Sequence, residues 1–275
     1  QTQELRGGSG MMKKTLIFIL CLLIVLWFCG PVLLILIAAL TPSAEYYDLA
    51  RLVPTKLTLT HLESLFVRLN GWKATLISIQ TALLSIVISF AIGLPAAYVL
   101  TRYVFKGKNL FRLTILLTRS FPVIIIGVPL VTLYLRIGIA DSVLGVSLAH
   151  SSMILPFIII ISSSILGGIS VEYEEAGMVF GLTRFRSFLR ITLPLALPGF
   201  AAAAIYAFVL SWNEVFISAI INLTNRTLPA HILNTAMTSP DYFKFAAGTV
   251  MALPAMIFIF FTRKYLMSMW GISLK

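Results

Sequence analysis

The sequence EEAGMVFGLTRFRSFLRITLP, residues 174–194, is the polar interruption around which the rest of the chain is arranged. The acids Glu174 and Glu175 at its start, with Glu172 just before it, fall where the first turns of a helix would lie, and acids there complement the positive end of the helix dipole. Ser170 can cap the start of this helix. Gly181 permits the left-handed backbone conformation that commonly ends one. We therefore expect a short helix that stops at a glycine turn.

A second short helix is expected after this turn. Thr183 can act as its N-cap, and the helix would continue to about Arg190. The pair Leu193-Pro194 would end it and start the next apolar run. Residues 170–193 are thus predicted to form a compact element of two short helices.

The composition around this element is that of an integral membrane protein. Of the 275 residues, 59% are hydrophobic and only 11% are charged, and the mean hydropathy is +0.98. A crossing helix needs roughly 20 residues, so the chain has room for about six. The formal charge of +11 does not indicate nucleic-acid binding, because the basic residues form short clusters between apolar runs.

The apolar runs predict an all-α, polytopic fold with six transmembrane helices. The expected spans are about 16–40, 74–100, 113–135, 148–168, 195–221 and 245–266. Basic clusters put both termini and the element at 170–193 on the cytoplasmic side. One transmembrane domain is expected over residues 11–275, preceded by a flexible tail or expression remnant over residues 1–10.

Motifs for catalysis are absent from the sequence. It has no P-loop, no HExxH or GxSxG pattern and no Cys/His ligand cluster. No catalytic residue, metal ligand or cofactor of its own is therefore predicted, and the chain is not expected to be an enzyme. Uphill transport would need energy from a partner or from an ion gradient.

The polar element resembles the EAA loop of permease subunits in ABC importers, which carries the helix that docks on the ATP-hydrolysing subunit. The residues that carry the resemblance are Glu175, Ala176, Gly181, Phe188, Leu193 and Pro194. Gly177 stands where a second alanine is usual, and Phe180 where an aspartate is common. The resemblance implies a type I ABC importer permease fold and an ATPase-coupling role for these six residues.

Two further stretches resemble one branch of these permeases. Residues 211–216, SWNEVF, are similar to a sequence in the fifth span of maltose- and trehalose-type carbohydrate permeases, and residues 254–275 are similar to that branch's last helix and tail. The resemblance implies import of a sugar, such as maltose or trehalose, with Lys275 contacting the ATPase. It also implies the following partners: a second permease, two ATP-binding subunits that hold ATP and Mg, an extracytoplasmic solute-binding protein and the lipid of a bacterial or archaeal cell membrane.

Trp212, Asn213 and Glu214 are the candidates for the substrate path. An ionised carboxylate inside a span costs a few kcal/mol or more unless it faces protein or water. Glu214 is therefore expected to face the translocation cavity or to pair with another span. A packing role for all three residues is equally open, because the second permease can make most of the sugar contacts.

Other transported solutes also remain open at this point. A polyol or a glycerol phosphate would suit the same kind of permease. The competing class is an ion-coupled secondary transporter, which predicts paired ionisable residues or broken helices in two related halves. The sequence has one clear intramembrane acid and no evident inverted repeat, and this favours the ATP-driven class.

Overall fold

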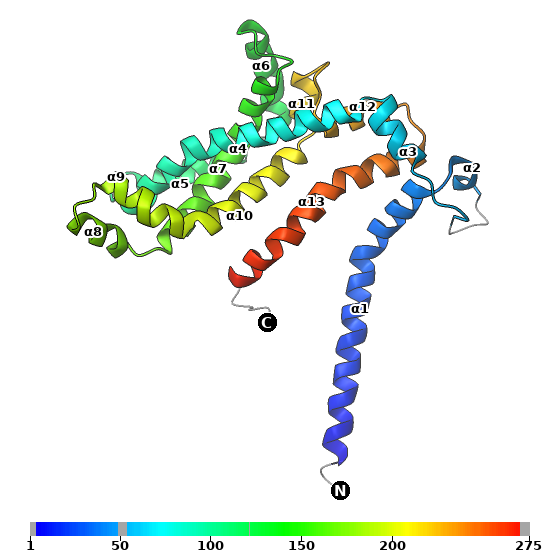
Figure 1. The fold of residues 1–275 in the computed structure, drawn as a ribbon, viewed down its shortest axis with the longest axis horizontal. Coiled ribbons are helices and arrows are strands. Elements are labelled where there is room, and N and C mark those ends of the chain that lie inside the picture. Colours follow the sequence, from blue (N-terminus) through cyan, green and yellow to red (C-terminus); the bar gives the residue numbers. More distant parts are fainter. Residues whose placement is uncertain (1–3, 49–53, 121, 270–275) are drawn as a thin grey trace. The chain divides into compact units, whose positions relative to one another are not determined.

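The computed structural model describes residues 4–48, 54–120 and 122–269, and over these residues the protein consists of helices and connecting loops (Figure 1). The elements are α1 (Glu4–Leu40), α2 (Ser43–Tyr46), α3 (Thr60–Glu63), the π-helical turn η1 (Ser64–Arg68), α4 (Gly71–Arg102), α5 (Lys108–Thr118), α6 (Val123–Arg136), α7 (Val143–Gly167), α8 (Glu172–Val179), α9 (Arg184–Ser187), the π-helical turn η2 (Phe188–Thr192), α10 (Leu193–Trp212), α11 (Phe216–Ile221), α12 (Leu228–Ala236) and α13 (Asp241–Met269). They form two compact units, one of residues 1–69 and 239–250 and one of residues 70–238 and 251–275.

The first unit contains the long helix α1. Its stretch Lys13–Leu40 is strongly apolar and is exposed within the structure, as expected of a surface that meets lipid. The helix begins at Glu4, so residues 4–10 are helical where a flexible tail was predicted. Each residue added to an existing helix gains one hydrogen bond, which allows a long apolar helix to extend into a poor helix-forming sequence.

An aromatic cluster holds the first unit together beyond α1. The Nε2 atom of His61 lies 2.9 Å from the carbonyl oxygen of Thr41, and the His61 ring is 4.5 Å from that of Tyr242. Tyr242 also makes an edge contact with Tyr46 at 5.8 Å. These contacts join the loop after α1 to the first turn of α13 and leave His61 buried.

In the second unit, α4 and α7 run in the same direction. The hydroxyl of Ser85 donates to the carbonyl of Ser147 at 3.0 Å, and that of Thr101 donates to the carbonyl of Ser163 at 3.3 Å. Both pairs are 62 residues apart, and such a constant offset occurs only between parallel helices. Small residues bring the two backbones close, as is common for helices packed in lipid.

The parallel arrangement requires the chain between α4 and α7 to return along them. α4 ends at Arg102, and the start of α7 packs beside Ser85 of α4. The chain must therefore go back along α4 from Arg102 to Ser85, a length of roughly 25 Å by helix rise. α5 and α6 make this return as two helices, where one span over 113–135 was predicted. The break falls before Pro122, which lacks an N–H and disfavours helical geometry in the residue before it.

α10 runs antiparallel to α7 and ends earlier than predicted. A Cβ on Gly199 would lie 2.9 Å from the side chain of Ile165, so these two helices touch at the glycine. The fifth span was expected to continue to residue 221, but α10 ends at Trp212 and α11 begins at Phe216. The backbone of α11 is capped by Glu214, as described below.

Four helical stretches among the described residues are long and apolar enough to cross a membrane. They are Lys13–Leu40, Gly71–Arg102, Val143–Gly167 and Arg184–Trp212. α6 is a shorter apolar helix, and α13 has 29 residues with Pro254 inside it. The protein is therefore a helical membrane protein.

Candidate functional site

The polar element at residues 170–193 consists of α8, α9 and η2. The hydroxyl of Ser170 accepts a hydrogen bond from the backbone N–H of Glu172 at 3.3 Å. Gly181 has a φ of 88°, which confirms the left-handed turn predicted after α8. Thr183 accepts from the N–H of Arg186 at 3.3 Å and so caps α9, also as predicted.

The second half of the element does not end at Leu193-Pro194, and this part of the prediction was wrong. The chain is helical from Arg184 to Trp212 without interruption. Pro194 follows directly on η2 and lies in the first turn of α10. A missing N–H costs least in a first turn, and the wider hydrogen-bond spacing of η2 gives proline room. α9 is thus continuous with α10 through η2.

Glu174 anchors this element to the membrane helices. The residue is buried, and its Oε1 atom accepts hydrogen bonds from Arg102 Nε and Thr192 Oγ1, each at 2.9 Å. Its Oε2 atom accepts from the hydroxyl of Tyr98 at 2.7 Å. The carboxylate therefore ties α8 to the end of α4 and to η2. Arg102 also donates to the carbonyl of Ile169 at 3.0 Å, which fixes the start of the element.

Gly177 lies where α8 presses against the helix that follows it. A Cβ at this position would be 2.7 Å from Ile191 Cδ1 and 2.7 Å from Ser187 Oγ. The hydroxyl of Ser187 in turn donates to the carbonyl of Glu174 at 2.8 Å. The close packing explains why glycine occupies a position where alanine is usual in the loop that this element resembles.

The opposite face of α8 is exposed in the part of the chain that the structure describes. Glu175 and Ala176 are exposed, as is Gly181 at the turn. Two large apolar side chains beside them, Val179 and Phe180, are 85% and 88% exposed. Exposed apolar side chains next to charged ones are typical of a surface that binds another protein.

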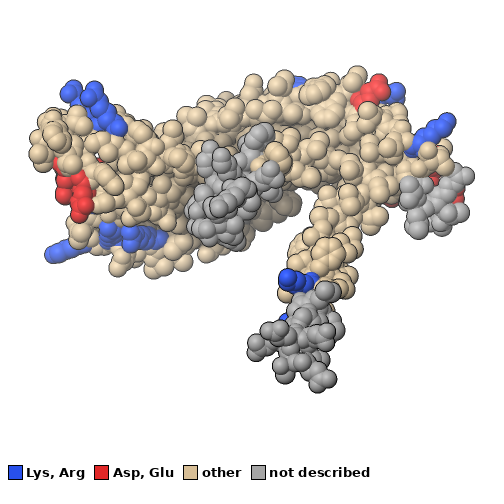
Figure 2. Space-filling model, turned by 60° about the horizontal axis from the view of Figure 1, so that its bottom comes forward, with Lys and Arg blue, Asp and Glu red and all other residues tan. Residues whose placement is uncertain are grey.

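Charged side chains gather at this end of the second unit. Figure 2 shows Lys and Arg together with Asp and Glu at the end that carries α8 and α9, and an almost uncharged surface along the adjoining helices. This distribution matches a membrane-embedded body with a charged element at its boundary with water.

Two of the other predicted coupling residues, Phe188 and Leu193, face the helix bundle. Phe188 packs its ring 5.0 Å from that of Tyr98, and Phe188 and Leu193 are partly buried against the cluster around Leu166 and Phe200. Pro194 is exposed. The structure therefore separates the six residues into an outer set on α8 and its turn and an inner set at the start of α10. Lys275 lies outside the described residues.

Glu214 caps α11 and pairs with α7. Its Oε1 atom accepts hydrogen bonds from the N–H groups of Phe216 and Ile217, both at 3.1 Å. Its Oε2 atom accepts from the N–H of Ser218 at 3.3 Å and lies 3.3 Å from His150 Nε2. The carboxylate thereby satisfies the first N–H groups of α11, and this accounts for the break in the predicted fifth span.

Of the three substrate-path candidates, Asn213 alone is exposed. Trp212 is buried and donates its indole N–H to the carbonyl of Met251 at 3.1 Å. Glu214 is buried in the arrangement just described. Beside it lies a cavity of about 70 Å³ lined by residues of α7 and α10 together with Glu214. This cavity is smaller than a sugar ring, so in this conformation Asn213 is the one candidate that a ligand can reach.

Sequence reasoning missed the partners of both buried acids. His150, the partner of Glu214, is 1% exposed, and its Nδ1 atom lies 2.8 Å from the hydroxyl of Ser211. Arg102, the partner of Glu174, lies 72 positions away from it in the sequence. For Glu214, the available signal was an acid inside an apolar run, since buried charges are normally paired.

A second polar connection lies at the end of the bundle opposite α8. Asp141, with a φ of 55°, accepts backbone hydrogen bonds from Thr224 and Asn225, both at 3.0 Å. Burial alone would raise the pKa of Asp141, but the hydrogen bonds from Asn225, Thr224 and Leu223 outweigh it, so the pKa lies below its usual value. This carboxylate ties the α6–α7 loop to the loop after α11.

Metal ligands do not gather in the part of the chain that the structure describes. No three side chains of the His, Cys, Asp or Glu types lie close enough to share an ion over those residues.

The chain that forms this site matches a known protein family. Residues 89–268 match the family described as binding-protein-dependent transport system inner membrane component. The chain is 29% identical over 257 residues to the trehalose transport system permease protein SugB of Mycobacterium tuberculosis (strain CDC 1551 / Oshkosh), covering 91% of this chain and 93% of that protein. It is 27% identical to the diacetylchitobiose uptake system permease protein DasC of Streptomyces coelicolor (strain ATCC BAA-471 / A3(2) / M145), covering 77% of this chain and 78% of that protein.

A solved structure shares the fold. It is a chain from the crystal structure of a bacterial ABC transporter involved in the import of the acidic polysaccharide alginate, with a TM-score of 0.74 and 16% identity, covering 94% of this chain and 97% of that one. The family match covers well over half of the chain, including the anchored element and the capped helix. The protein therefore belongs to the family of binding-protein-dependent transport system inner membrane components.

Proposed function

We propose that this protein is a permease subunit of an ATP-driven carbohydrate importer and forms half of its translocation pathway. The family match supports the permease role. Two relatives that match along most of the chain are named for trehalose and for diacetylchitobiose, which are both sugars. The transported solute is accordingly a sugar, with a di- or oligosaccharide as the first candidate.

Six crossings fit the described helices. They are α1, α4, the α5–α6 pair, α7, α10 with α11, and α13. The parallel run of α4 and α7 supports the α5–α6 pair as a crossing, because the chain has to return between them. The basic residues near the ends of α4 and α9 support a cytoplasmic position for those ends, and both termini are proposed to lie on the same side.

The proposed coupling mechanism rests on the buried carboxylate of Glu174, which joins α8 to α4 and η2. One face of α8 is held to α4 and η2 by this carboxylate, and the other face presents Glu175, Val179 and Phe180 outward. An ATPase subunit docked on the outer face, through Glu175, Ala176 and the Gly181 turn, would move α4 and α10 together. Such rigid-body motion is a common way to alternate between two states of a transporter.

The inner coupling residues and the last helix complete this role. Phe188, Leu193 and Pro194 lie where α9 continues into α10, so they transmit the motion rather than contact the ATPase. Lys275 at the end of the chain is proposed as a further contact with the ATPase. Asn213 is proposed to contact the sugar, and Trp212 and Glu214 to hold the helix ends beside it.

The complete importer would contain partners that supply the energy and the substrate. We expect a second, similar permease, two ATP-binding subunits that bind ATP and Mg²⁺, and an extracytoplasmic solute-binding protein. The chain itself would then need no cofactor and catalyse no reaction.

The coupling role is tested in the assembled complex by measuring ATP hydrolysis stimulated by sugar-loaded binding protein. Glu175→Ala and Gly181→Trp are expected to keep basal hydrolysis and lose stimulation. Glu172→Ala, an exposed acid on the same helix, is the matched control and is expected to retain stimulation. Full stimulation in both Glu175→Ala and Gly181→Trp would contradict the assignment.

The substrate class is tested by uptake of labelled solutes into proteoliposomes. Trehalose and other disaccharides, a polyol and glycerol 3-phosphate would be compared, with and without ATP inside. Uptake of a disaccharide that needs ATP is the expected result. Uptake that follows an ion gradient without ATP would instead indicate a secondary transporter.

A further inference from the structure

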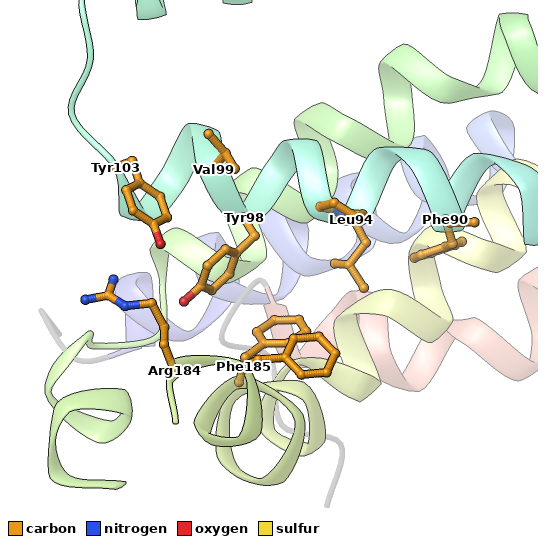
Figure 3. Close-up of a pocket in the computed structure, with 10 residues that line it drawn as sticks. Phe90, Leu94, Tyr98, Val99, Tyr103, Arg184 and Phe185 are labelled. Atoms are coloured by element: carbon orange, nitrogen blue, oxygen red, sulfur yellow. The ribbon is translucent and has the colours of Figure 1, made fainter. Parts of the chain in front are cut away.

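A groove of about 560 Å³ opens between α4 and the α9–η2 segment (Figure 3). It belongs to neither the outer face of α8 nor the surroundings of Asn213. The residues that line it are Phe90, Ala91, Leu94, Pro95, Tyr98, Val99, Tyr103, Arg184, Phe185 and Phe188. Several of the lining side chains are exposed, so the groove is open at the surface of this chain.

The lining is apolar along α4 and polar at one end. Figure 3 shows Phe90 and Leu94 away from Arg184, and the Tyr98 and Tyr103 hydroxyls near it. The Arg184 Cζ atom lies 5.5 Å from the centre of the Tyr103 ring. The groove thus has an apolar surface along α4 and the positive charge of Arg184 at the end of α4.

The guanidinium of Arg184 is available to bind an anionic ligand. Among the described residues, no carboxylate lies within ion-pair distance of its guanidinium. The nearby Glu174 is buried and already accepts hydrogen bonds from Tyr98, Arg102 and Thr192. No acid lines the groove that could pair with the ammonium of a zwitterionic head group.

We propose that this groove binds one anionic phospholipid. An acyl chain would lie against Phe90, Leu94 and Phe188, and the phosphate would lie beside Arg184. A basic site at the membrane boundary between helices is a known kind of site for anionic head groups. A sugar fits less well, because the lining has few hydrogen-bonding groups and sugars need several. The proposal does not depend on the proposed transport function, although the groove shares Phe188 with the residues assigned to coupling.

Lipid binding to the purified full-length chain in detergent tests the proposal. Native mass spectrometry would follow retention of added phosphatidylglycerol, with phosphatidylcholine as the zwitterionic comparison. Arg184→Gln is expected to weaken phosphatidylglycerol binding about fivefold and to leave phosphatidylcholine unchanged. Arg186→Gln removes an exposed arginine that is not part of the lining and is expected to change neither. Leu94→Trp would fill the apolar part and reduce retention of both lipids.

A measurement on the unchanged protein keeps the test valid if a variant fails to fold. Phosphatidylglycerol with a photoactivatable acyl chain is expected to label peptides that contain residues 90–103 or 184–188. Labelling confined to other helices would overturn the proposal. So would equal phosphatidylglycerol retention by Arg184→Gln and Arg186→Gln, which would show only general lipid contact. Loss of a partner ATPase from Arg184→Gln with full lipid retention would overturn it too and assign the groove to a protein contact.

Discussion

Glu174 and Arg102 form a buried ion pair in which Arg102 Nε lies 2.9 Å from Glu174 Oε1, with side chains 2% and 6% exposed. The two residues are 72 positions apart, on α8 and at the end of α4. Their neighbour Glu175 is exposed. Two adjacent acids therefore have different environments, and substitutions at the two positions separate anchoring from docking.

Glu174→Ala is expected to destabilise the protein strongly. It removes one partner of a buried pair and leaves the Arg102 charge without compensation, which typically costs about 3–5 kcal/mol. Thermal unfolding of the purified chain in detergent measures this, with Glu175→Ala as the control that changes stability by less than about 0.5 kcal/mol. Equal midpoints for the two variants would show that the pair does not hold α8.

Gly177→Ala is expected to lower stability by about 1–3 kcal/mol, because its added methyl group would meet Ile191 and Ser187 at 2.7 Å. The matched control is Gly248→Ala in α13, where no described atom outside the adjacent helix backbone lies within 4 Å of the added carbon. Alanine is the better helix former by roughly 1 kcal/mol, so the control is expected to be neutral or stabilising. The same unfolding measurement compares the two, and a neutral Gly177→Ala would indicate that α8 can move away from η2.

Much of this architecture could be predicted because apolar runs and basic clusters are local features of a sequence. The Gly181 turn and the Thr183 cap followed from single residues with narrow conformational preferences. Helix ends were predicted less well. The break after Trp212 depends on the hydrogen bonds that Glu214 makes in the folded chain, and the continuity through Pro194 depends on the preceding turn η2.

The partners of buried charges could not be predicted, because they come from distant positions. Nothing local distinguishes Glu174 from Glu175 as the anchored acid, since the choice depends on which side of α8 meets Arg102 and Tyr98. His150 likewise became a partner of Glu214 only through the packing of α7 against α10. Which face of a short helix is buried is decided by tertiary structure.

His150 and Glu214 are expected to be energetically coupled. Glu214→Gln keeps the shape of the side chain but weakens both the cap on α11 and the contact with His150. His150→Phe leaves the carboxylate buried with fewer partners. A double-mutant cycle on unfolding free energy should give a coupling of about 0.5–3 kcal/mol, as is usual for residues in contact. The pair Glu214 and Glu172, two described residues of the second unit between which the structure gives no direct contact, serves as the control cycle, and additive effects in the His150 cycle would contradict the coupling.

Asp141 is expected to make stability fall in acid. Because its hydrogen bonds hold the folded-state pKa below the ordinary value, the contribution of Asp141 is complete above the unfolded-state pKa of about 4 and is lost as the pH falls through the folded-state value. Asp141→Asn removes this titration while asparagine tolerates the same positive φ. Unfolding midpoints measured from pH 7 to pH 3 should therefore converge for the two proteins at the acid end. An unchanged gap across this range would show that Asp141 titrates alike in the folded and unfolded chains, and that its bonds to Thr224 and Asn225 do not favour the charged form.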